Sequence, residues 1–527
     1  MFNGYKMEKS ISRRDFLKLM ALLPPSIFWS KFAIKPERTL QNPDAKNILI
    51  IVFDTLSAQH ASFNGYPRET MPHLARVLDK ATVYHNHYAG GNWTTPGTAS
   101  ILTGTYPWTH RAFNQADYIA KDRERNNLFN AFNQFYRIGY SHNSIVDRFL
   151  RQFSEDLDFL KPQMDLFVAR GISPDRLFPW DNDIASLSWD RIIKKGEKGY
   201  TYSPILARLY ERYTEQSSHE RIATLLEEFP RGIPRIREDD YFLLEDAIEW
   251  LISRLKTIPQ PFLGYFHYLP PHSPYNTRRD FVNVFAGDSV GYYIEKPAHP
   301  FFSKSPLGRP LNLKYQANKR QWYDEFILYS DAEFGRLYDS MEKSGLLETT
   351  WLVFTSDHGE LFERGIIGHR TPVLYQPVIQ VPLVILEPGQ TQRRDIYTST
   401  SAVDLLPTLL KITGQPIPNW AEGSILPPFF GVHSDSQRSI YALEATDSND
   451  ANPLNPASVM LVKGKYKLTY YFGYKELVKV GPQFELFDLE NDPNELNNIY
   501  RSDSEIAQEL RRELLNKITE VDKPYQG

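Results

Sequence analysis

The sequence predicts an α/β fold: a doubly wound, mostly parallel sheet flanked by helices, followed by a small C-terminal antiparallel α+β domain. Three observations predict it. From residue 47 onward, apolar strand-like runs alternate with amphipathic helical segments, as in a parallel sheet with helical crossovers. The first run, 47-NILIIVF-53, is a continuous apolar stretch, typical of a strand buried on both faces. Near residue 430 the pattern changes to short, closely spaced runs with a period of two.

The elements of the α/β part follow in order. After the first strand, a proline in the first turn favours a helix over 71–81. Gly139-Tyr140 is expected to open a strand, and residues 145–240 are irregular, charged and mostly helical. Asp239 to Ile258 is expected to form an amphipathic helix. The remaining predicted elements are strand 262–269, a helix over 321–344 that ends at Gly345, and strands 351–354 and 381–386.

The C-terminal part is predicted to be a small antiparallel sheet followed by a helix over 503–521. We place a domain boundary near residue 432. The chain then divides into an N-terminal segment of residues 1–40, a large α/β domain over 44–432 and a C-terminal subdomain over 433–527. The predicted strands of the last part are 439–444, 457–464, 465–472 and 483–489.

The composition limits the kinds of site. Of the 527 residues, 41% are hydrophobic, which is enough for a large core and for more than one domain. The chain has no cysteine, which excludes disulfides, thiolate metal sites and a cysteine nucleophile. The formal net charge of −4 gives no basic bias, so no nucleic-acid partner is expected.

The N-terminus has the features of an export signal. Residues 12-SRRDFLK-18 and the apolar stretch LMALLPPSIFW after them resemble a bacterial twin-arginine signal; a disordered basic tail is the alternative. The apolar stretch is shorter than the about 20 residues that a membrane span needs. No small-x-small cleavage site follows, so the segment could remain as a membrane attachment. We expect export by the twin-arginine machinery to a periplasmic or other extracytoplasmic location.

Residues suited to chemistry follow several predicted strands. Asp54 follows the first strand, His272 follows strand 262–269, and Asp357-His358 follow strand 351–354. In open α/β sheets, ligands bind beyond the carboxyl ends of the strands, so these side chains are expected at one rim. Each alone has an ordinary explanation, because an Asp after a strand often caps a turn. Carboxylate plus imidazole is, however, a common metal pair, and the convergence indicates a metal-dependent site.

The order of these motifs resembles the sulfatase family of the alkaline phosphatase superfamily. The resemblance spans roughly residues 46–500 and is interrupted by the poorly matched helical region. It implies one divalent metal ion held by Asp54, Asp357 and His358, with Thr94 completing the shell. Mixed carboxylate and imidazole ligands allow Ca, Mg, Mn or Zn. The similar stretches are 47–77, 269-LPPHSPY-275, 355-TSDHGE-360, 402-AVDLLPTLLKITG-414 and 484-FELFDLENDPNE-495.

The stretch 93-WTTPGTASILTG-104 resembles the nucleophile loop of the family, with Thr94 at the nucleophile position. There are two alternatives: Thr95 is the nucleophile, or the threonine only caps the helix. Sulfatases convert a Cys or Ser here to formylglycine, which an Arg steadies. Thr94 carries a methyl group on its β-carbon, and Thr98 stands in place of that Arg. These departures favour direct attack by a threonine alkoxide, and a helix beginning near Thr98 is expected to aim backbone N–H groups at the substrate.

Two histidines are implied as further catalytic residues. His272 and His369 are expected to contact the oxygens of the transferred group or to protonate the leaving group. The Gly-Lys-Trp-His element of many sulfatases is absent; the chain has Ser141-His142 after Gly139-Tyr140. His142 is therefore a weaker candidate for contacting the leaving group.

Three functions remain open. The first is a metal-dependent hydrolase or transferase that acts through Thr94 on phosphate-type esters of a small molecule, a glycan or a lipid headgroup outside the cytoplasm. The second is a sulfuric ester hydrolase that works without formylglycine. The third is an inactive binding or scaffold protein of the same fold, against which the retained Asp54, Asp357 and His358 argue.

Overall fold

The computed structural model describes residues 45–169, 221–236, 240–288, 296–302, 313–430 and 438–526. The chain separates into two compact units, Met1–Thr39 and Leu40–Gly527, and all described residues belong to the second unit. The predicted export signal, part of the irregular region over 145–240 and the boundary near residue 432 lie outside the described residues. The division into domains therefore remains a prediction.

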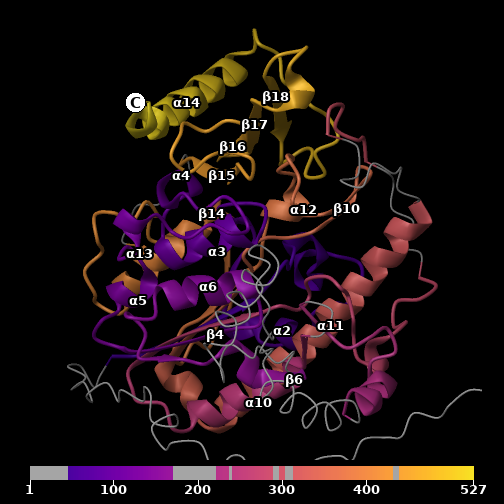
Figure 1. Ribbon diagram of the computed structural model, residues 1–527, viewed down its shortest axis with the longest axis vertical. Coiled ribbons are helices and arrows are strands. Elements are labelled where there is room, and N and C mark those ends of the chain that lie inside the picture. Colours follow the sequence, from indigo (N-terminus) through magenta and orange to yellow (C-terminus); the bar gives the residue numbers. More distant parts are fainter. Residues whose placement is uncertain are drawn as a thin grey trace, which may run out of the picture. The chain divides into compact units, whose positions relative to one another are not determined.

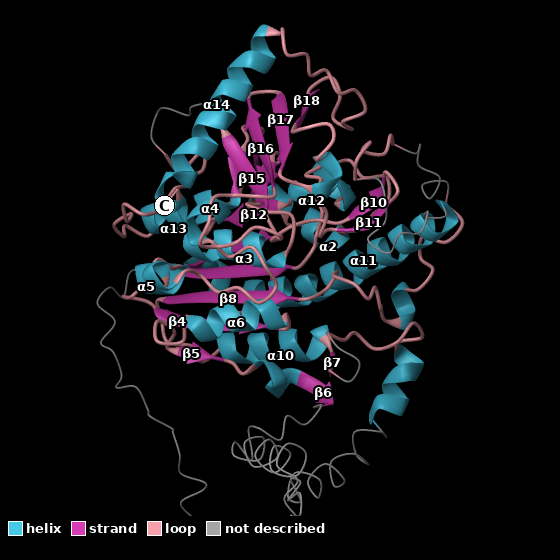
Figure 2. Ribbon diagram, turned by 45° about the horizontal axis from the view of Figure 1, so that its top comes forward, coloured by secondary structure: helices cyan, strands magenta, loops and turns pink. Residues whose placement is uncertain are grey.

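A large mixed sheet lies at the centre of the described part (Figures 1 and 2). Its strands are β1 Asn47–Phe53, β2 Thr82–Tyr84, β4 Tyr136–Ser141, β5 Phe159–Leu160, β8 Phe262–Tyr268, β9 Thr350–Thr355, β12 Leu383–Leu386 and β13 Arg394–Ile396. Among the described residues this sheet has eight strands in the order β13-β2-β12-β9-β1-β8-β4-β5.

The strands are parallel except β12, which is antiparallel to both of its neighbours, β9 and β2. Strand β1 pairs in parallel with β9 on one side and β8 on the other. The carboxyl ends of β9, β1 and β8 therefore meet at one rim of the sheet, although the strands come from distant parts of the sequence. The predicted doubly wound, mostly parallel fold is confirmed.

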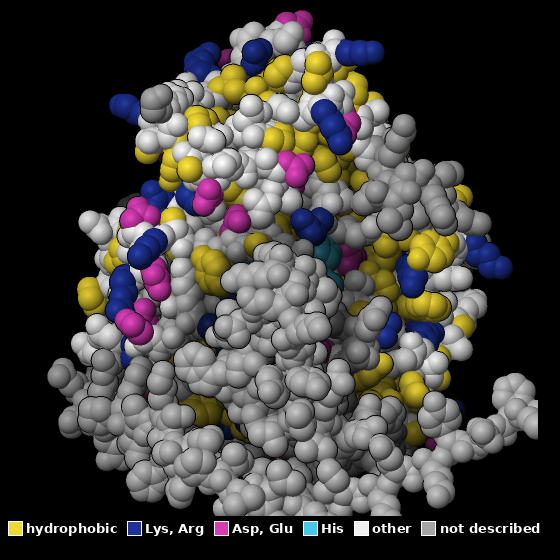
Figure 3. All heavy atoms as spheres, in the orientation of Figure 1, with side chains coloured by type: hydrophobic (Ala, Val, Ile, Leu, Met, Phe, Trp, Pro, Cys, Tyr) yellow, Lys and Arg dark blue, Asp and Glu magenta, His cyan; other side chains and the backbone are white. Residues whose placement is uncertain are grey.

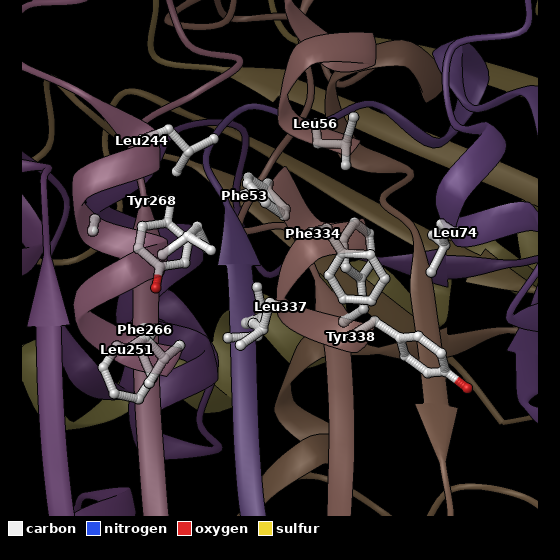
Figure 4. Close-up of a cluster of buried hydrophobic side chains, with 14 of the residues drawn as sticks. Phe53, Leu56, Leu74, Leu244, Leu251, Phe266, Tyr268, Phe334, Leu337 and Tyr338 are labelled. Carbon is white, nitrogen blue, oxygen red and sulfur yellow. The ribbon is translucent and has the colours of Figure 1, made fainter. Parts of the chain in front are cut away.

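Strand β1 shows why both faces of the sheet are covered. Its seven residues are all buried, and alternate side chains point to opposite faces. Leu49, Ile51 and Phe53 pack into one apolar cluster with helices α10 (Leu244–Leu255) and α11 (Leu313–Lys343). Ile48, Ile50 and Val52 pack into another with helices α3 (Thr94–Thr103), α6 (Ser144–Gln152) and α13 (Leu405–Ile412). Figure 4 shows the first cluster, with Phe53 of β1 among side chains of the covering helices.

The helices of the described residues include α2 Pro72–Ala75, α3 Thr94–Thr103, α4 Pro107–His110, α5 Leu128–Ala131, α6 Ser144–Gln152, α10 Leu244–Leu255, α11 Leu313–Lys343, α12 Gln376–Ile379, α13 Leu405–Ile412 and α14 Glu505–Asp522. Among the described residues, none of these helices is both long enough and apolar enough to cross a bilayer.

Several predicted element boundaries were wrong. The helix expected over 71–81 breaks into α2 and a 3-10 turn at Leu78–Lys80, because Arg76 and Val77 close the first turn with short-range hydrogen bonds. The helix expected from Asp239 begins only at Leu244, after the short strand β7 Tyr241–Phe242. Helix α11 begins eight residues before the predicted start at residue 321. Gly139 lies inside β4 and does not open it.

The C-terminal strands form a four-stranded antiparallel sheet in sequence order, as predicted. They are β15 Ile440–Glu444, β16 Ala457–Lys463, β17 Tyr466–Phe472 and β18 Gln483–Asp488. Helix α14 covers one face of this sheet through Leu510 and Leu514. The other face packs against α12 and the β10–β11 hairpin, so this sheet is held directly on the α/β part (Figure 2). The smaller strands are β3 His87–Tyr88, β6 Phe167–Ala169, β10 Leu361–Glu363, β11 Ile366–Gly368 and β14 Thr400–Ser401.

Candidate active site

Three loops that follow neighbouring parallel strands build the site. Asp54 comes directly after β1, and its backbone N–H donates to the carbonyl of Tyr268, the last residue of β8, at 2.9 Å. Asp357 and His358 follow β9 on the other side of β1. The strand order β9-β1-β8 thus brings these residues together, as the sequence predicted.

Asp54, Asp357 and His358 form a compact, fully buried cluster. One ligand atom from each lies within 4.8 Å of the others. Nε2 of His358 lies 3.4 Å from Oδ1 of Asp54 and 3.7 Å from Oδ2 of Asp357. Nδ1 of His358 lies 2.9 Å from the carbonyl oxygen of Gly359, which accepts a hydrogen bond from it. This contact leaves the lone pair of Nε2 directed toward the carboxylates, as a metal ligand requires.

Uncharged donors hold the two carboxylates. The amide of Asn143 donates to Oδ2 of Asp54 at 2.5 Å, and the hydroxyl of Thr55 donates to Oδ1 at 2.7 Å. The hydroxyl of Thr98 donates to Oδ2 of Asp357 at 3.1 Å. Burial raises the pKa of the Asp54 carboxyl, but the rings of His267 and His358 outweigh burial and hold that pKa well below 3.8.

This donor set fits a divalent cation. Neither carboxylate forms an ion pair with a lysine or arginine among the described residues. The basic groups beside these two buried carboxylates are the imidazoles of His267 and His358, and a cation between the carboxylates would offset their burial further. Burial lowers the pKa of His358, but the Asp357 and Asp54 carboxylates outweigh it and raise the pKa to about 9. The residues present would therefore hold a metal ion of the kind that carboxylate and imidazole ligands bind.

Thr94 lies beside this cluster, at the start of α3. Its side chain is nearly buried, and Oγ1 lies 3.3 Å from Nε2 of His358. Gly97 permits this approach, because a Cβ there would lie 2.2 Å from the carbonyl oxygen of Asp357. The expectation that the helix begins near Thr98 was wrong. Trp93 is extended and α3 begins at Thr94, so the unpaired N–H groups of its first turn belong to the threonine loop itself.

His272 and His369 lie next to each other at the open side of the cluster. Their ring centroids are 5.1 Å apart, and the His369 ring lies 4.4 Å from the His358 ring. Figure 3 shows histidine side chains reaching the surface near the middle of one face, beside basic and acidic side chains. The two predicted histidines are therefore close to the three ligand candidates, and they are less buried than Thr94.

A buried carboxylate orients His369. Oε1 of Glu360 lies 3.0 Å from Nδ1 of His369, and Oε2 accepts a hydrogen bond from the hydroxyl of Tyr275 at 3.0 Å. Burial raises the pKa of Glu360, but the imidazoles of His369, His272 and His358 together outweigh burial and lower that pKa below 4.5. Nδ1 of His272, in contrast, contacts the carbonyl oxygen of Ser273 at 2.6 Å. Of the two histidines, His369 is the one that a carboxylate supports.

His142 lies in an aromatic environment. Its ring stacks on Phe242 with centroids 4.2 Å apart and also contacts Tyr140, Phe167 and Tyr268. Burial lowers the pKa of His142 to about 3. A ring that stays neutral between aromatic side chains is suited to packing and not to proton transfer.

Sequence reasoning missed three residues beside the site: Asn143, Glu360 and His267. Glu360 was visible only as the last letter of 355-TSDHGE-360. His267 stands in β8 opposite Val52 of β1. Because side chains alternate along a strand, His267 lies on the same face of the sheet as Asp54. This alternation is present in the run FLGYFHYL, but the apolar neighbours of His267 made a packing role the simpler interpretation.

A separate cavity of about 570 Å³ is lined by polar and aromatic side chains that include His60, Tyr66, His85 and Tyr397. None of the predicted site residues lines it, so its volume says nothing about the reaction.

The chain is similar to known proteins in sequence and in fold. The family model described as Sulfatase matches residues 46–415, and that described as N-sulphoglucosamine sulphohydrolase, C-terminal, matches residues 363–523. Arylsulfatase K of Bos taurus is 23% identical over 499 residues, covering 90% of this chain and 81% of that protein. Phosphonate monoester hydrolase SpPMH of Silicibacter pomeroyi has a TM-score of 0.60 at 19% identity, covering 90% of this chain and 95% of that chain. A 2-O GAG sulfatase has a TM-score of 0.63 at 16% identity, covering 92% and 94%. The two solved structures share the fold.

Proposed function

Because this chain belongs to the sulfatase family, we propose that it is a metal-dependent hydrolase that cleaves sulfate esters by direct attack of the Thr94 hydroxyl. One observation carries this proposal. The buried Oγ1 of Thr94 lies 3.3 Å from Nε2 of His358, beside two buried carboxylates at the carboxyl ends of the strands. The attacking group therefore lies directly beside the candidate metal ligands.

Asp54, Asp357 and His358 would hold the divalent ion. When bound there, such an ion would lower the pKa of the Thr94 hydroxyl and screen the charge of an anionic substrate. Oγ1 of Thr94, its proton lost to water, forms a bond to sulfur as the bond to the leaving oxygen breaks. Water then attacks the sulfated threonine and releases sulfate, which regenerates Thr94.

His369 is suited to give a proton to the leaving oxygen. Glu360 holds Nδ1 of its ring, so Nε2 is free to face a substrate. Burial lowers the pKa of His369, while Glu360 raises it in part. An anionic substrate beside the ring would raise that pKa further, so that the proton is present when it is needed. His272 is suited to bind an oxygen of the transferred group, since its ring lies next to that of His369.

The names of the relatives support sulfate as the transferred group, ahead of the phosphate-type esters that the sequence alone favoured. Both Arylsulfatase K and the 2-O GAG sulfatase are named for sulfate esters. The latter name also supports a sulfated glycan as the substrate class. Residues 12-SRRDFLK-18 support an extracytoplasmic location, where such a polymer would be met.

Phosphate-type esters are the second candidate, and Thr94 is the observation that favours them. The β-carbon of threonine carries a methyl group, so this side chain cannot become an aldehyde and must react as an alkoxide. The same attack suits phosphorus, with transfer to water or to an acceptor hydroxyl. SpPMH, which shares the fold, is named for phosphonate monoesters.

The test uses the purified full chain loaded in turn with Ca, Mg, Mn or Zn. Matched nitrophenyl esters of sulfate, phosphate and phosphonate, and a phosphodiester, are compared for the wild type and Thr94→Ala. Sulfate-ester turnover that disappears in the variant supports the proposal, and mass spectrometry of the peptide with Thr94 should find the covalent intermediate. Turnover of phosphorus esters alone would make the second candidate the function. Full turnover by Thr94→Ala would refute direct attack by this residue.

A further inference from the structure

His267 is a fully buried histidine that points at the site from strand β8. Its Nε2 lies 3.3 Å from Oδ2 of Asp54 and 3.8 Å from Oδ2 of Asp357. Among the described residues no contact of this nitrogen has the geometry of a good hydrogen bond, although Oδ2 of Asp54 lies 3.3 Å away. A buried polar atom without a partner is rare and calls for one. Here the missing partner lies in the direction of two carboxylates.

The other ring nitrogen of His267 is held in place. Nδ1 lies 3.1 Å from the hydroxyl of Tyr265, two residues earlier on the same strand. Burial and the nearby carboxylates raise the pKa of Tyr265 well above 10, so the hydroxyl keeps its proton. In the tautomer that carries its proton on Nδ1, the hydroxyl oxygen accepts from Nδ1 and the lone pair of Nε2 is directed toward Asp54 and Asp357.

The distances around Nε2 of His267 match those around Nε2 of His358. Nε2 of His358 lies 3.4 Å from Oδ1 of Asp54, whereas Nε2 of His267 lies 3.3 Å from Oδ2 of the same carboxylate. Both nitrogens lie near Oδ2 of Asp357, at 3.7 Å for His358 and 3.8 Å for His267. Both nitrogens are therefore too far from the carboxylates for good hydrogen bonds, yet both face them from within the core. The two imidazoles therefore approach the Asp54 carboxylate at different oxygens, and His267 borders the group formed by Asp54, Asp357 and His358.

We propose that His267 is a further protein ligand of the metal ion, so that the centre has two imidazole and two carboxylate ligands besides Thr94. This inference rests on the metal centre of the proposed function. It also narrows the choice of ion. Two nitrogen ligands suit zinc or manganese, whereas calcium and magnesium prefer oxygen ligands throughout. We therefore expect zinc or manganese to bind more tightly than calcium or magnesium.

The first test counts nitrogen ligands in the wild-type holoenzyme. Pulsed electron paramagnetic resonance of the protein loaded with Mn²⁺ should detect two inequivalent imidazole nitrogens. His267→Phe should leave one, and His142→Phe should leave both. His142 is the matched control, because it is also a fully buried histidine, but its ring stacks on Phe242. A single coupled imidazole in the wild-type protein would overturn the proposal without any variant.

The second test measures affinity by equilibrium dialysis. Zn²⁺ and Mn²⁺ should bind the wild type more tightly than Ca²⁺ and Mg²⁺, and His267→Phe should weaken Zn²⁺ binding by about 100-fold while His142→Phe does not. If His267→Phe fails to fold, Tyr265→Phe replaces it, because only the hydroxyl on Nδ1 is lost, and a smaller loss of affinity is expected. Preferred binding of Ca²⁺, or equal Zn²⁺ affinity in His267→Phe and the wild type, would overturn the proposal.

These measurements do not depend on turnover. A protein with two imidazole ligands that cleaves no sulfate ester would keep this inference and refute the proposed function. A protein that cleaves sulfate esters with one imidazole ligand would support the proposed function and refute this inference.

Discussion

The hydroxyl oxygen of Thr94 lies 3.3 Å from Nε2 of His358, although 264 residues separate the two along the chain. The contact joins the first residue of α3 to the loop after β9. It exists because α3 packs on the same face of the sheet as Asp54, and because Gly97 has no side chain to keep the helix away from Asp357. The position of the Thr94 hydroxyl relative to the ligand candidates therefore depends on the packing of α3 against Asp357.

Thr94→Ala should lower kcat/KM for a sulfate ester by at least about 10³-fold, because it removes the attacking oxygen. Thr94→Ser keeps the hydroxyl and should keep activity, provided that mass spectrometry finds the serine unmodified. Thr95→Ala is the neighbouring control, since the Thr95 hydroxyl makes no hydrogen bond among the described residues. Loss of activity in Thr95→Ala with full activity in Thr94→Ala would exchange the roles of the two threonines.

Glu360→Gln should slow the hydrolysis of an alkyl sulfate by about 100-fold and that of nitrophenyl sulfate by much less. The variant removes the charge that holds His369, and only a poor leaving group needs its proton. The measurement is the dependence of kcat on the pKa of the leaving alcohol. This dependence should be steeper in Glu360→Gln than in the wild type. Glu363→Gln is the control, because Glu363 pairs with Lys296 instead. An equal loss for both substrates would indicate a purely structural role for Glu360.

Thr98→Val should weaken metal binding by about tenfold, because Oδ2 of Asp357 loses the donor at 3.1 Å that orients it. Titration calorimetry with Zn²⁺ measures this loss. Ser100→Ala is the control on the same helix, since Ser100 contacts His110 and no ligand candidate. An unchanged dissociation constant in Thr98→Val would show that Asp357 needs no such support.

Metal binding should strengthen as pH rises from about 6.5 toward 9 and then level off, because a proton on Nε2 of His358 competes with the metal. The sign follows from the pKa of His358, which its carboxylate neighbours raise to about 9. In the metal-free protein the same raised pKa stabilises the fold below pH 6.5, and this stabilisation is lost as pH rises through 9. The increase in melting temperature on adding Zn²⁺ should therefore grow over this range. A shift independent of pH would contradict the prediction.

Much of the site could be predicted because its residues stand directly after apolar strands. Asp54, Asp357 and His358 follow β1 and β9, and a parallel sheet brings such positions to one rim. His267 and Glu360 could not be found in this way. His267 lies within an apolar strand, where the sequence gives no reason to expect more than a packing role. The role of Glu360 is visible only in the structure, where the β10–β11 hairpin brings His369 next to it.

By itself, the sequence determined the fold class, the antiparallel C-terminal sheet and the residue types of the site, because apolar periodicity and the residues at strand ends are local properties. Only the tertiary structure decided that α3 begins at Thr94, that Glu360 supports His369, and that Nε2 of His267 faces the two carboxylates. These relationships are distances between side chains far apart in the chain. They depend on strand order, strand register and close packing of helix on loop, which no local pattern of residues specifies.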